Sequence, residues 1–140
     1  MINDFFDQVN ERFELGDSEI NQLSPLVLAY IGDSVYEVFI RSYLIKRESG
    51  ASVHKLHKLS VEYVKAKAQS DIIHRISEKL TPEETDVVRR GRNARSGTIP
   101  KNADIIEYKY ATGFESLIGY LYLKKDFNRL MELLLMSMDN

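Results

Sequence analysis

Two long segments of the chain are apolar almost all round, and they limit the possible folds more than any other feature. Residues 25–45 carry three charged side chains, and residues 111–123 carry one. A helix that is hydrophobic on every side is normally buried at the centre of a domain. We therefore expect both segments to be central helices.

The rest of the chain shows helical spacing and no convincing run of alternating polar and apolar residues. Leu56, Leu59 and Tyr63, for example, fall on one face of a helix. Ser24-Pro25 and Thr81-Pro82 each fit a helix cap followed by proline in the first turn. The sequence predicts an all-α domain with helices near residues 3–14, 25–47, 52–69, 70–80, 82–91, 103–124 and 126–138.

Composition excludes several classes of protein. With 140 residues, 44% apolar and 29% charged, the chain is predicted to form one globular domain over residues 1–140. No apolar run reaches the roughly 18 residues of a membrane span, and the acidic start lacks the features of a signal peptide. The chain has no cysteine, which excludes disulfides and thiolate metal sites, so we expect a cytoplasmic protein. Glycine-rich phosphate loops and the HExxH motif are absent.

Three carboxylates occur in the two apolar segments, where burial would penalise them. Such a group needs a basic partner, a helix cap, a proton or a cation. Glu37 lies four residues after Asp33 and four before Arg41, a spacing that favours an ion pair for Glu37. Asp33 and Glu115, on facing helices, would repel each other unless a divalent ion bridged them, and oxygen ligands suit Mg²⁺ or Mn²⁺. A structural ion pair or cap remains the alternative for both.

The net charge of −2 hides a basic middle between acidic ends. Residues 41–101 hold 14 Lys or Arg against 7 Asp or Glu, and residues 89–103 hold five cations and no acid. Arginine clusters bind phosphates, although a solvated loop or an exposed helix face explains the same pattern. The candidate nucleic-acid contacts are Arg89, Arg90, Arg92, Asn93, Arg95 and Lys101, together with Lys55 and Lys58 on a preceding helix.

Two separated motifs resemble the catalytic domain of the ribonuclease III family. Residues 28–37, LAYIGDSVYE, resemble its signature helix, and residues 114–123, FESLIGYLYL, resemble its second metal-binding helix. Two motifs in the right order are much more specific than one. The segment from RGRNARSG to LIGYLYL is closer still to one branch, Mini-ribonuclease III, which lacks the appended double-stranded-RNA-binding domain. The resemblance covers roughly residues 20–138. That extra domain is expected to be absent here too.

The resemblance implies an all-helical homodimer that binds double-stranded RNA in its two-fold valley, with one Mg²⁺-dependent centre for each strand. Carried over by position, Asp33 and Glu115 are the catalytic metal ligands. Two further acids of the family are replaced by Ala29 and Thr112. The ion would then keep more waters, and the number of metal ions stays open. Glu37 matches a family glutamate for which we predict no catalytic role.

We therefore expect an endoribonuclease that uses Mg²⁺, with Mn²⁺ as a substitute, and leaves a 5′-phosphate and a 3′-hydroxyl. Membership of the branch implies the precursor of 23S ribosomal RNA as substrate. It leaves open whether a ribosomal protein must first shape that RNA. The alternative functions are a catalytically silent helical RNA-binding module, as the two missing acids suggest, and a protein-interaction domain without an RNA role.

Overall fold

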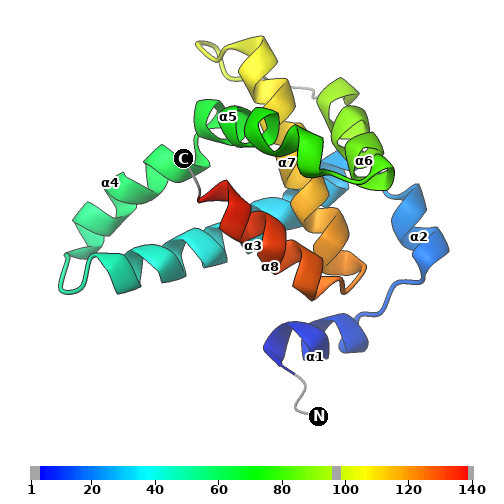
Figure 1. Ribbon diagram of the computed structural model, residues 1–140, viewed down its shortest axis with the longest axis horizontal. Coiled ribbons are helices and arrows are strands. Elements are labelled where there is room, and N and C mark those ends of the chain that lie inside the picture. The colour runs from blue at the N-terminus through cyan, green and yellow to red at the C-terminus, as the bar shows by residue number, and fades with distance from the viewer. Residues whose placement is uncertain (1–3, 96–98, 139–140) are drawn as a thin grey trace.

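The computed structural model describes residues 4–95 and 99–138, and every regular element in those ranges is a helix. This confirms the predicted all-α fold. The helices gather around α7, which packs most extensively against α3, α5 and α6 (Figure 1). The elements are α1 (Phe5–Arg12), α2 (Asp17–Gln22), α3 (Pro25–Arg47), α4 (Val53–Val64), α5 (Ala66–Ile76), η1 (Ser77–Lys79), α6 (Pro82–Asn93), α7 (Ile105–Leu123) and α8 (Phe127–Ser137).

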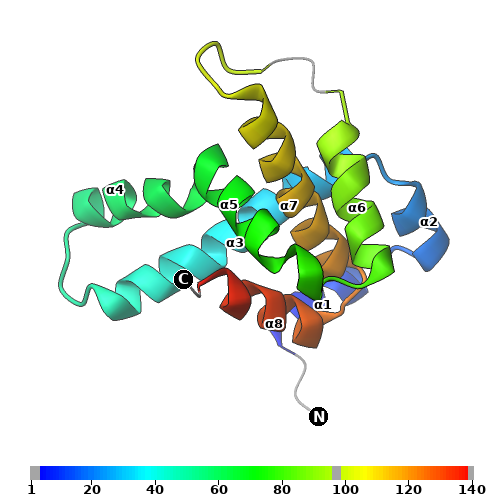
Figure 2. The ribbon, with the colours of Figure 1, turned by 45° about the horizontal axis from the view of Figure 1, so that its top comes forward.

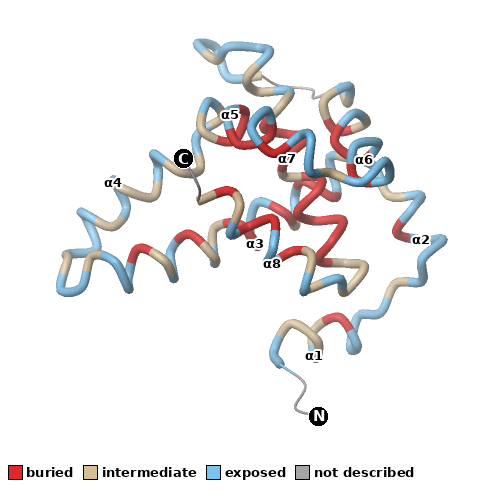
Figure 3. Tube along the Cα trace, viewed as in Figure 1, coloured by how far each residue is buried: buried red, intermediate tan, exposed pale blue. Residues whose placement is uncertain are grey.

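Helix α7 forms the centre of the core, as the sequence predicts. Residues 111–122 are buried, apart from half-buried Glu115, and Figure 3 shows this helix as the longest buried stretch. The fully buried rings of Phe114 and Tyr36, from α7 and α3, pack edge to face with centroids 5.0 Å apart. Burying such side chains stabilises the fold by roughly 1.5–3 kcal/mol each. No helix in the described residues is long and apolar enough to cross a membrane.

Helix α3 is central but is not buried on all sides, which corrects the expectation from its composition. Val27, Tyr30 and Val38 are 47, 79 and 50% exposed. Their spacing places them along one side of the helix, while Leu28, Tyr36 and other residues on the opposite side pack into the core. An apolar helix thus has one face covered by α7 and one face open.

The predicted caps fix where α3 and α6 begin. The Ser24 hydroxyl accepts a hydrogen bond of 3.2 Å from the Leu26 backbone N–H. Thr81 and Glu84 form a reciprocal capping box at the start of α6. At its other end α6 continues to Asn93, two residues beyond the predicted end at residue 91, so most of the arginine-rich segment 89–95 is helical.

The predicted boundary between the helices 52–69 and 70–80 is wrong. The chain bends at Lys65 (φ −64°, ψ 154°), which ends α4 and begins α5 without a side-chain cap. Neither proline nor glycine marks this bend in the sequence. It is decided by packing, because α5 lies along α7 whereas α4 has no buried residue and projects with the end of α3 (Figures 1 and 3). The short helix α2 is also absent from the prediction.

Candidate active site

The backbones of α3 and α7 touch at their crossing because each helix has a glycine there. A methyl group on Gly32 would lie 1.9 Å from the Glu115 carbonyl oxygen, and one on Gly119 would lie 1.9 Å from the Leu28 carbonyl oxygen. These distances are far inside van der Waals contact, so a larger residue would force the helices apart. The crossing brings Asp33, the residue after Gly32, beside Glu115.

A buried serine fixes the start of α3 against the same helix. The Ser116 hydroxyl, on α7, is fully buried and donates a hydrogen bond of 2.8 Å to the Pro25 carbonyl oxygen. This bond gives the buried Ser116 hydroxyl an acceptor and ties the first turn of α3 to α7. Together with the glycine contacts, it determines how α3 is placed on α7.

The carboxylates of Asp33 and Glu115 form the polar centre of this crossing. Burial chiefly, and then the hydrogen bond and the negative charge of Asp33, raise the pKa of Glu115 to about 8. Asp33 itself is exposed, so the expectation of a buried acid is wrong at this position. The pair therefore combines a half-buried carboxylate with one that faces solvent, and a cation can reach it from outside.

Two more polar side chains act on Glu115. The amide of Gln69, which is 1% exposed on α5, lies beside the Glu115 carboxylate and lowers its pKa, whereas the charge of Glu37 raises it. Glu37 also pairs with Arg41 at 3.1 Å, which confirms the predicted ion pair one helical turn apart. The centre thus draws on three helices, α3, α5 and α7.

Sequence reasoning did not identify Gln69, although the sequence contained a signal. Gln69 precedes Ile72, Ile73 and Ile76 at the spacing of one helix face, and all three isoleucines are buried. A glutamine on the apolar face of a helix needs a buried partner. That partner could not be named before α5 and α7 were seen side by side.

Ala29 and Thr112, which stand where the family resemblance expects acids, bring no charge to the centre. Both are buried, and the Thr112 hydroxyl donates a hydrogen bond of 3.0 Å to the Tyr108 carbonyl oxygen. Within residues 4–95 and 99–138, no three His, Cys, Asp or Glu side chains gather as a metal-binding group. The centre offers two carboxylates, Asp33 and Glu115, which suits an ion that retains several water ligands.

The predicted contacts of the arginine-rich segment lie mainly on the last turns of α6. Arg89 and Arg90 both form ion pairs with Asp86. The Asp86 carboxylate partly neutralises the two arginines, and they lower its pKa. Arg92 lies over the Tyr110 ring, 5.6 Å from its centroid, and donates a hydrogen bond of 3.3 Å to Asn93. Of the three arginines, Arg92 is therefore the one whose positive charge is least neutralised by a neighbouring carboxylate.

Arg95 and Lys101 are exposed in the connection between α6 and α7. Figure 2 shows residues 99–104 of this connection reaching beyond the ends of both helices. Residues 95–100, RSGTIP, are rich in residues that favour turns and predict a loop here, of which residues 96–98 lie outside the described residues. Arg95 and Lys101 are thus placed where a large polyanion can approach them.

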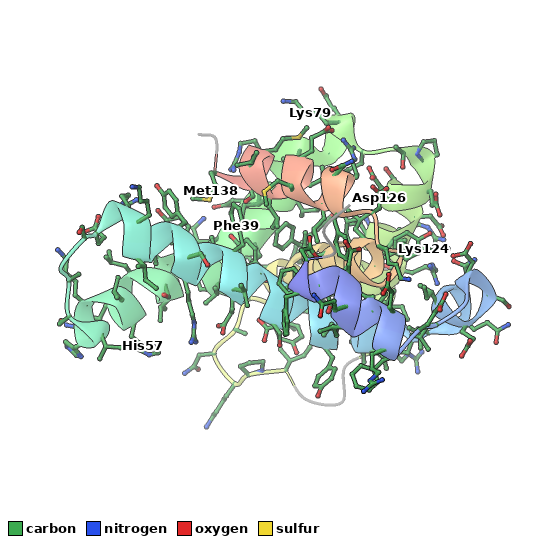
Figure 4. The ribbon with its side chains drawn as sticks, turned by 90° about the horizontal axis from the view of Figure 1, so that it is seen from below. Phe39, His57, Lys79, Lys124, Asp126 and Met138 are labelled. Carbon is green, nitrogen blue, oxygen red and sulfur yellow. The ribbon has the colours of Figure 1, made fainter. Side chains whose placement is uncertain are left out.

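The other two predicted contacts, Lys55 and Lys58, are exposed on α4. Lys55 pairs with Glu48 at 3.4 Å. Figure 4 places His57, their neighbour in α4, on the projecting hairpin of α3 and α4. Figures 1 and 2 show this hairpin and the α6–α7 connection as separate projections, so the predicted contacts form two groups.

The fold and the paired acids define a class of protein. The sequence pattern of the Ribonuclease III domain family matches residues 26–126, which include both motif helices. The chain belongs to the ribonuclease III family, and it is an endoribonuclease.

More particularly, its relatives are Mini-ribonuclease 3 proteins. That of Clostridium tetani is 50% identical over 121 residues, covering 86% of this chain and 80% of the relative. That of Thermoanaerobacter sp. is 52% identical over 115 residues, covering 82% and 80%. A crystal structure of a Fusobacterium nucleatum protein has the same fold, with a TM-score of 0.76 and 32% identity over 85% of this chain and 94% of that one. The resemblance to the Mini-ribonuclease III branch is confirmed.

Proposed function

We propose that this endoribonuclease cleaves double-stranded RNA with a divalent cation, Mg²⁺ or Mn²⁺, held by Asp33 and Glu115. The observation that carries the proposal is the contact between these two carboxylates at the α3–α7 crossing. When both are ionised, two acids this close repel each other, and a bound cation would remove that repulsion. Oxygen ligands from Asp and Glu are those that Mg²⁺ and Mn²⁺ prefer.

When bound, such an ion supplies a water activated for attack and stabilises charge on the phosphate. Glu115 must give up its proton to bind a cation, so binding releases a proton wherever the pH is below about 8. Asp33 contributes its solvent-facing carboxylate to the side from which RNA would arrive. In hydrolysis the water oxygen bonds to the phosphorus, and the bond between the phosphorus and the 3′ oxygen breaks. The 3′ oxygen leaves as a hydroxyl, and the phosphate stays on the 5′ side, as expected.

The proposed RNA contacts are the two groups of cations described above. Arg92, Arg95 and Lys101 would bind phosphates near the α6–α7 connection, and Lys55 and Lys58 would bind them from α4. A-form RNA presents its phosphates and 2′-hydroxyls across a wide minor groove, which suits contacts from separate projections. The pairs of Arg89 and Arg90 with Asp86 would have to open, so we expect these two to contribute less.

The open apolar face of α3 supports a homodimer as the working form. Leu26, Val27 and Tyr30 are 37, 47 and 79% exposed on the first turns of this helix. Apolar residues of this kind, grouped on one helix, are typical of surfaces that bind another protein. A two-fold pair joined there would place two centres, one for each RNA strand, as the family resemblance implies.

Membership of the Mini-ribonuclease III branch favours the precursor of 23S ribosomal RNA, processed in the cytoplasm. A ribosomal protein that shapes this RNA is a compatible partner, because two acids at the centre give a site that depends strongly on how the RNA is presented.

The first test is incubation with long duplex RNA, in Mg²⁺ and in EDTA, beside the Asp33→Asn variant. We expect discrete Mg²⁺-dependent fragments from the wild type and none from Asp33→Asn, which should fold and still bind RNA. Intact RNA in every lane, with binding that weakens as salt rises, would favour a silent binding module instead. Equal loss of folding and binding in Asp33→Asn would show that Asp33 is structural.

A further inference from the structure

Gln69 is a buried polar residue whose side-chain nitrogen the rest of the fold does not use. It lies near the start of α5 and is 1% exposed. Its Nε2 atom has no hydrogen-bond partner among the described residues. A buried donor without a partner costs folding free energy, and native proteins retain few of them. Packing alone therefore does not explain why a glutamine stands here.

The group that faces this amide is the Glu115 carboxylate. Helix α5 packs along α7, and the buried Gln69 amide lies close enough to the Glu115 carboxylate to interact with it, although its nitrogen is not seated in a formed hydrogen bond with any described residue. Only the amide nitrogen can donate to this carboxylate, because a carboxylate oxygen accepts hydrogen bonds and the amide oxygen cannot donate one. Gln69 is thus directed at one of the two proposed metal ligands.

We propose that Gln69 is a positioning residue that holds the Glu115 carboxylate in the orientation a divalent cation requires. The inference rests on the proposed function of Asp33 and Glu115. A hydrogen bond from Nε2 to one carboxylate oxygen fixes the rotation of the group and leaves the other oxygen turned toward Asp33 and the ion. Orientation matters more here than in a site with four acids, because Ala29 and Thr112 contribute no charge.

The test replaces Gln69 by methionine, which keeps the length of the side chain and removes the donor. Mn²⁺ binding to the whole protein, without RNA, is titrated by electron paramagnetic resonance. Loss of a hydrogen bond to a metal ligand typically weakens metal binding 10–100-fold, so we expect at least about tenfold weaker binding. In cleavage assays, the half-saturating Mg²⁺ concentration should rise by a similar factor, while the rate at saturating Mg²⁺ stays within about twofold of wild type.

Asn10→Leu is the matched control. Asn10 is another buried amide, and its Nδ2 atom donates to the Phe6 carbonyl at 3.1 Å and to the Tyr122 carbonyl at 3.4 Å, away from the two acids. Its loss should lower thermal stability and leave the Mn²⁺ affinity unchanged. A role of Gln69 in packing alone predicts the same result for Gln69→Met.

Wild-type Mn²⁺ affinity in Gln69→Met would overturn the inference. So would a cleavage rate that falls equally at every Mg²⁺ concentration, because that pattern indicates a structural defect. If circular dichroism shows that Gln69→Met does not fold, the same titration of Gln69→Leu decides. The Asp33→Asn variant separates this inference from the proposed function. If the wild type and Asp33→Asn bind Mn²⁺ equally well, Asp33 and Glu115 do not form a metal site. If Asp33→Asn loses Mn²⁺ binding and Gln69→Met does not, the metal site is supported and the proposed role of Gln69 is wrong.

Discussion

At the scale of the residue, Glu115 is the side chain whose charge opposes folding. Its pKa is about 8 in the folded protein and about 4.5 in the unfolded chain, so the folded state holds its proton more tightly. Below pH 4.5 both states are protonated and the carboxyl costs nothing. Between pH 4.5 and 8 the folded state loses stability as the pH rises, by about 1.4 kcal/mol for each pH unit at most. This loss of stability results from the burial of Glu115 beside Asp33, the position in which both carboxylates would bind a cation.

We predict that Glu115→Gln stabilises the fold at high pH while it abolishes cleavage. The amide has the shape of the protonated acid and never becomes charged beside Asp33. Urea denaturation in EDTA should give equal free energies of unfolding for variant and wild type near pH 4.5. At pH 8.5 the variant should be more stable, on the order of a few kcal/mol.

Glu78→Gln, at an exposed position of η1, should show no such difference between the two pH values. A wild-type pH dependence in Glu115→Gln would mean that another group causes the loss of stability.

The corresponding expectation for the wild type is that Mn²⁺ binds more tightly as the pH rises toward 8, because the metal and the proton compete for Glu115.

At the scale of the element, the decisive feature is the close crossing of α3 and α7. Gly32 and Gly119 let the two backbones touch, and the same contact sets Asp33 beside Glu115. Fold stability and the geometry of the centre therefore depend on one helix–helix contact. A change that separates the helices should damage both.

We predict that Gly32→Ala lowers the free energy of unfolding by at least about 2 kcal/mol, because the new methyl group would overlap the Glu115 carbonyl oxygen. Thermal unfolding measures the loss, and cleavage should fall further than the unfolded fraction explains. Gly16→Ala is the control, since its methyl group would meet its nearest atom at 3.7 Å, an ordinary contact. Equal stability of the two variants would mean that the crossing tolerates a wider spacing.

At the scale of the whole molecule, the charges and the open apolar face are distributed over separate surfaces. Cations gather at the α6–α7 connection and on the projecting α4, and apolar residues line the first turns of α3. The overall charge of −2 conceals this arrangement.

We predict that replacing Arg95 and Lys101 by glutamine reduces the salt dependence of RNA binding. Each lost phosphate contact should lower the slope of log affinity against log salt by about 1. Binding is measured in the Asp33→Asn background, so that the RNA stays intact. Lys79→Gln, which Figure 4 places on the opposite side of the molecule from the α6–α7 connection, is the control and should leave the slope unchanged. Unchanged slopes in both variants would exclude phosphate contacts at the connection.

We predict that Tyr30→Asp prevents dimer formation. Tyr30 is 79% exposed in the single chain, and a second copy would bury it, so a charge there should cost the dimer far more than the monomer. Sedimentation velocity should show a dimer for the wild type and a monomer for the variant, with unchanged helix content by circular dichroism. Lys46→Asp, an exposed charge near the other end of α3, should leave the dimer intact. A wild-type monomer at micromolar concentration would contradict the proposed dimer.

Features that depend on neighbours along the chain could be predicted before the fold was known. Helical spacing predicted the all-α fold, and the Ser24 and Thr81 caps predicted where two helices begin. The i,i+4 spacing predicted the Glu37–Arg41 pair. The two separated motifs identified the ribonuclease III family and singled out Asp33 and Glu115. Each of these rests on hydrogen bonds or contacts within a few residues, or on a motif read in order.

Which helix covers which face became known from the folded structure. It showed that Asp33 is exposed while Glu115 is half-buried, and that Gln69 from a third helix joins them. It also placed the bend at Lys65, where the packing of α5 on α7 outweighs the helical propensity of the chain. Periodicity gives each helix an apolar side, but the partner of that side is chosen by contacts between residues far apart in the sequence. The burial and pKa of Glu115 depend on those contacts.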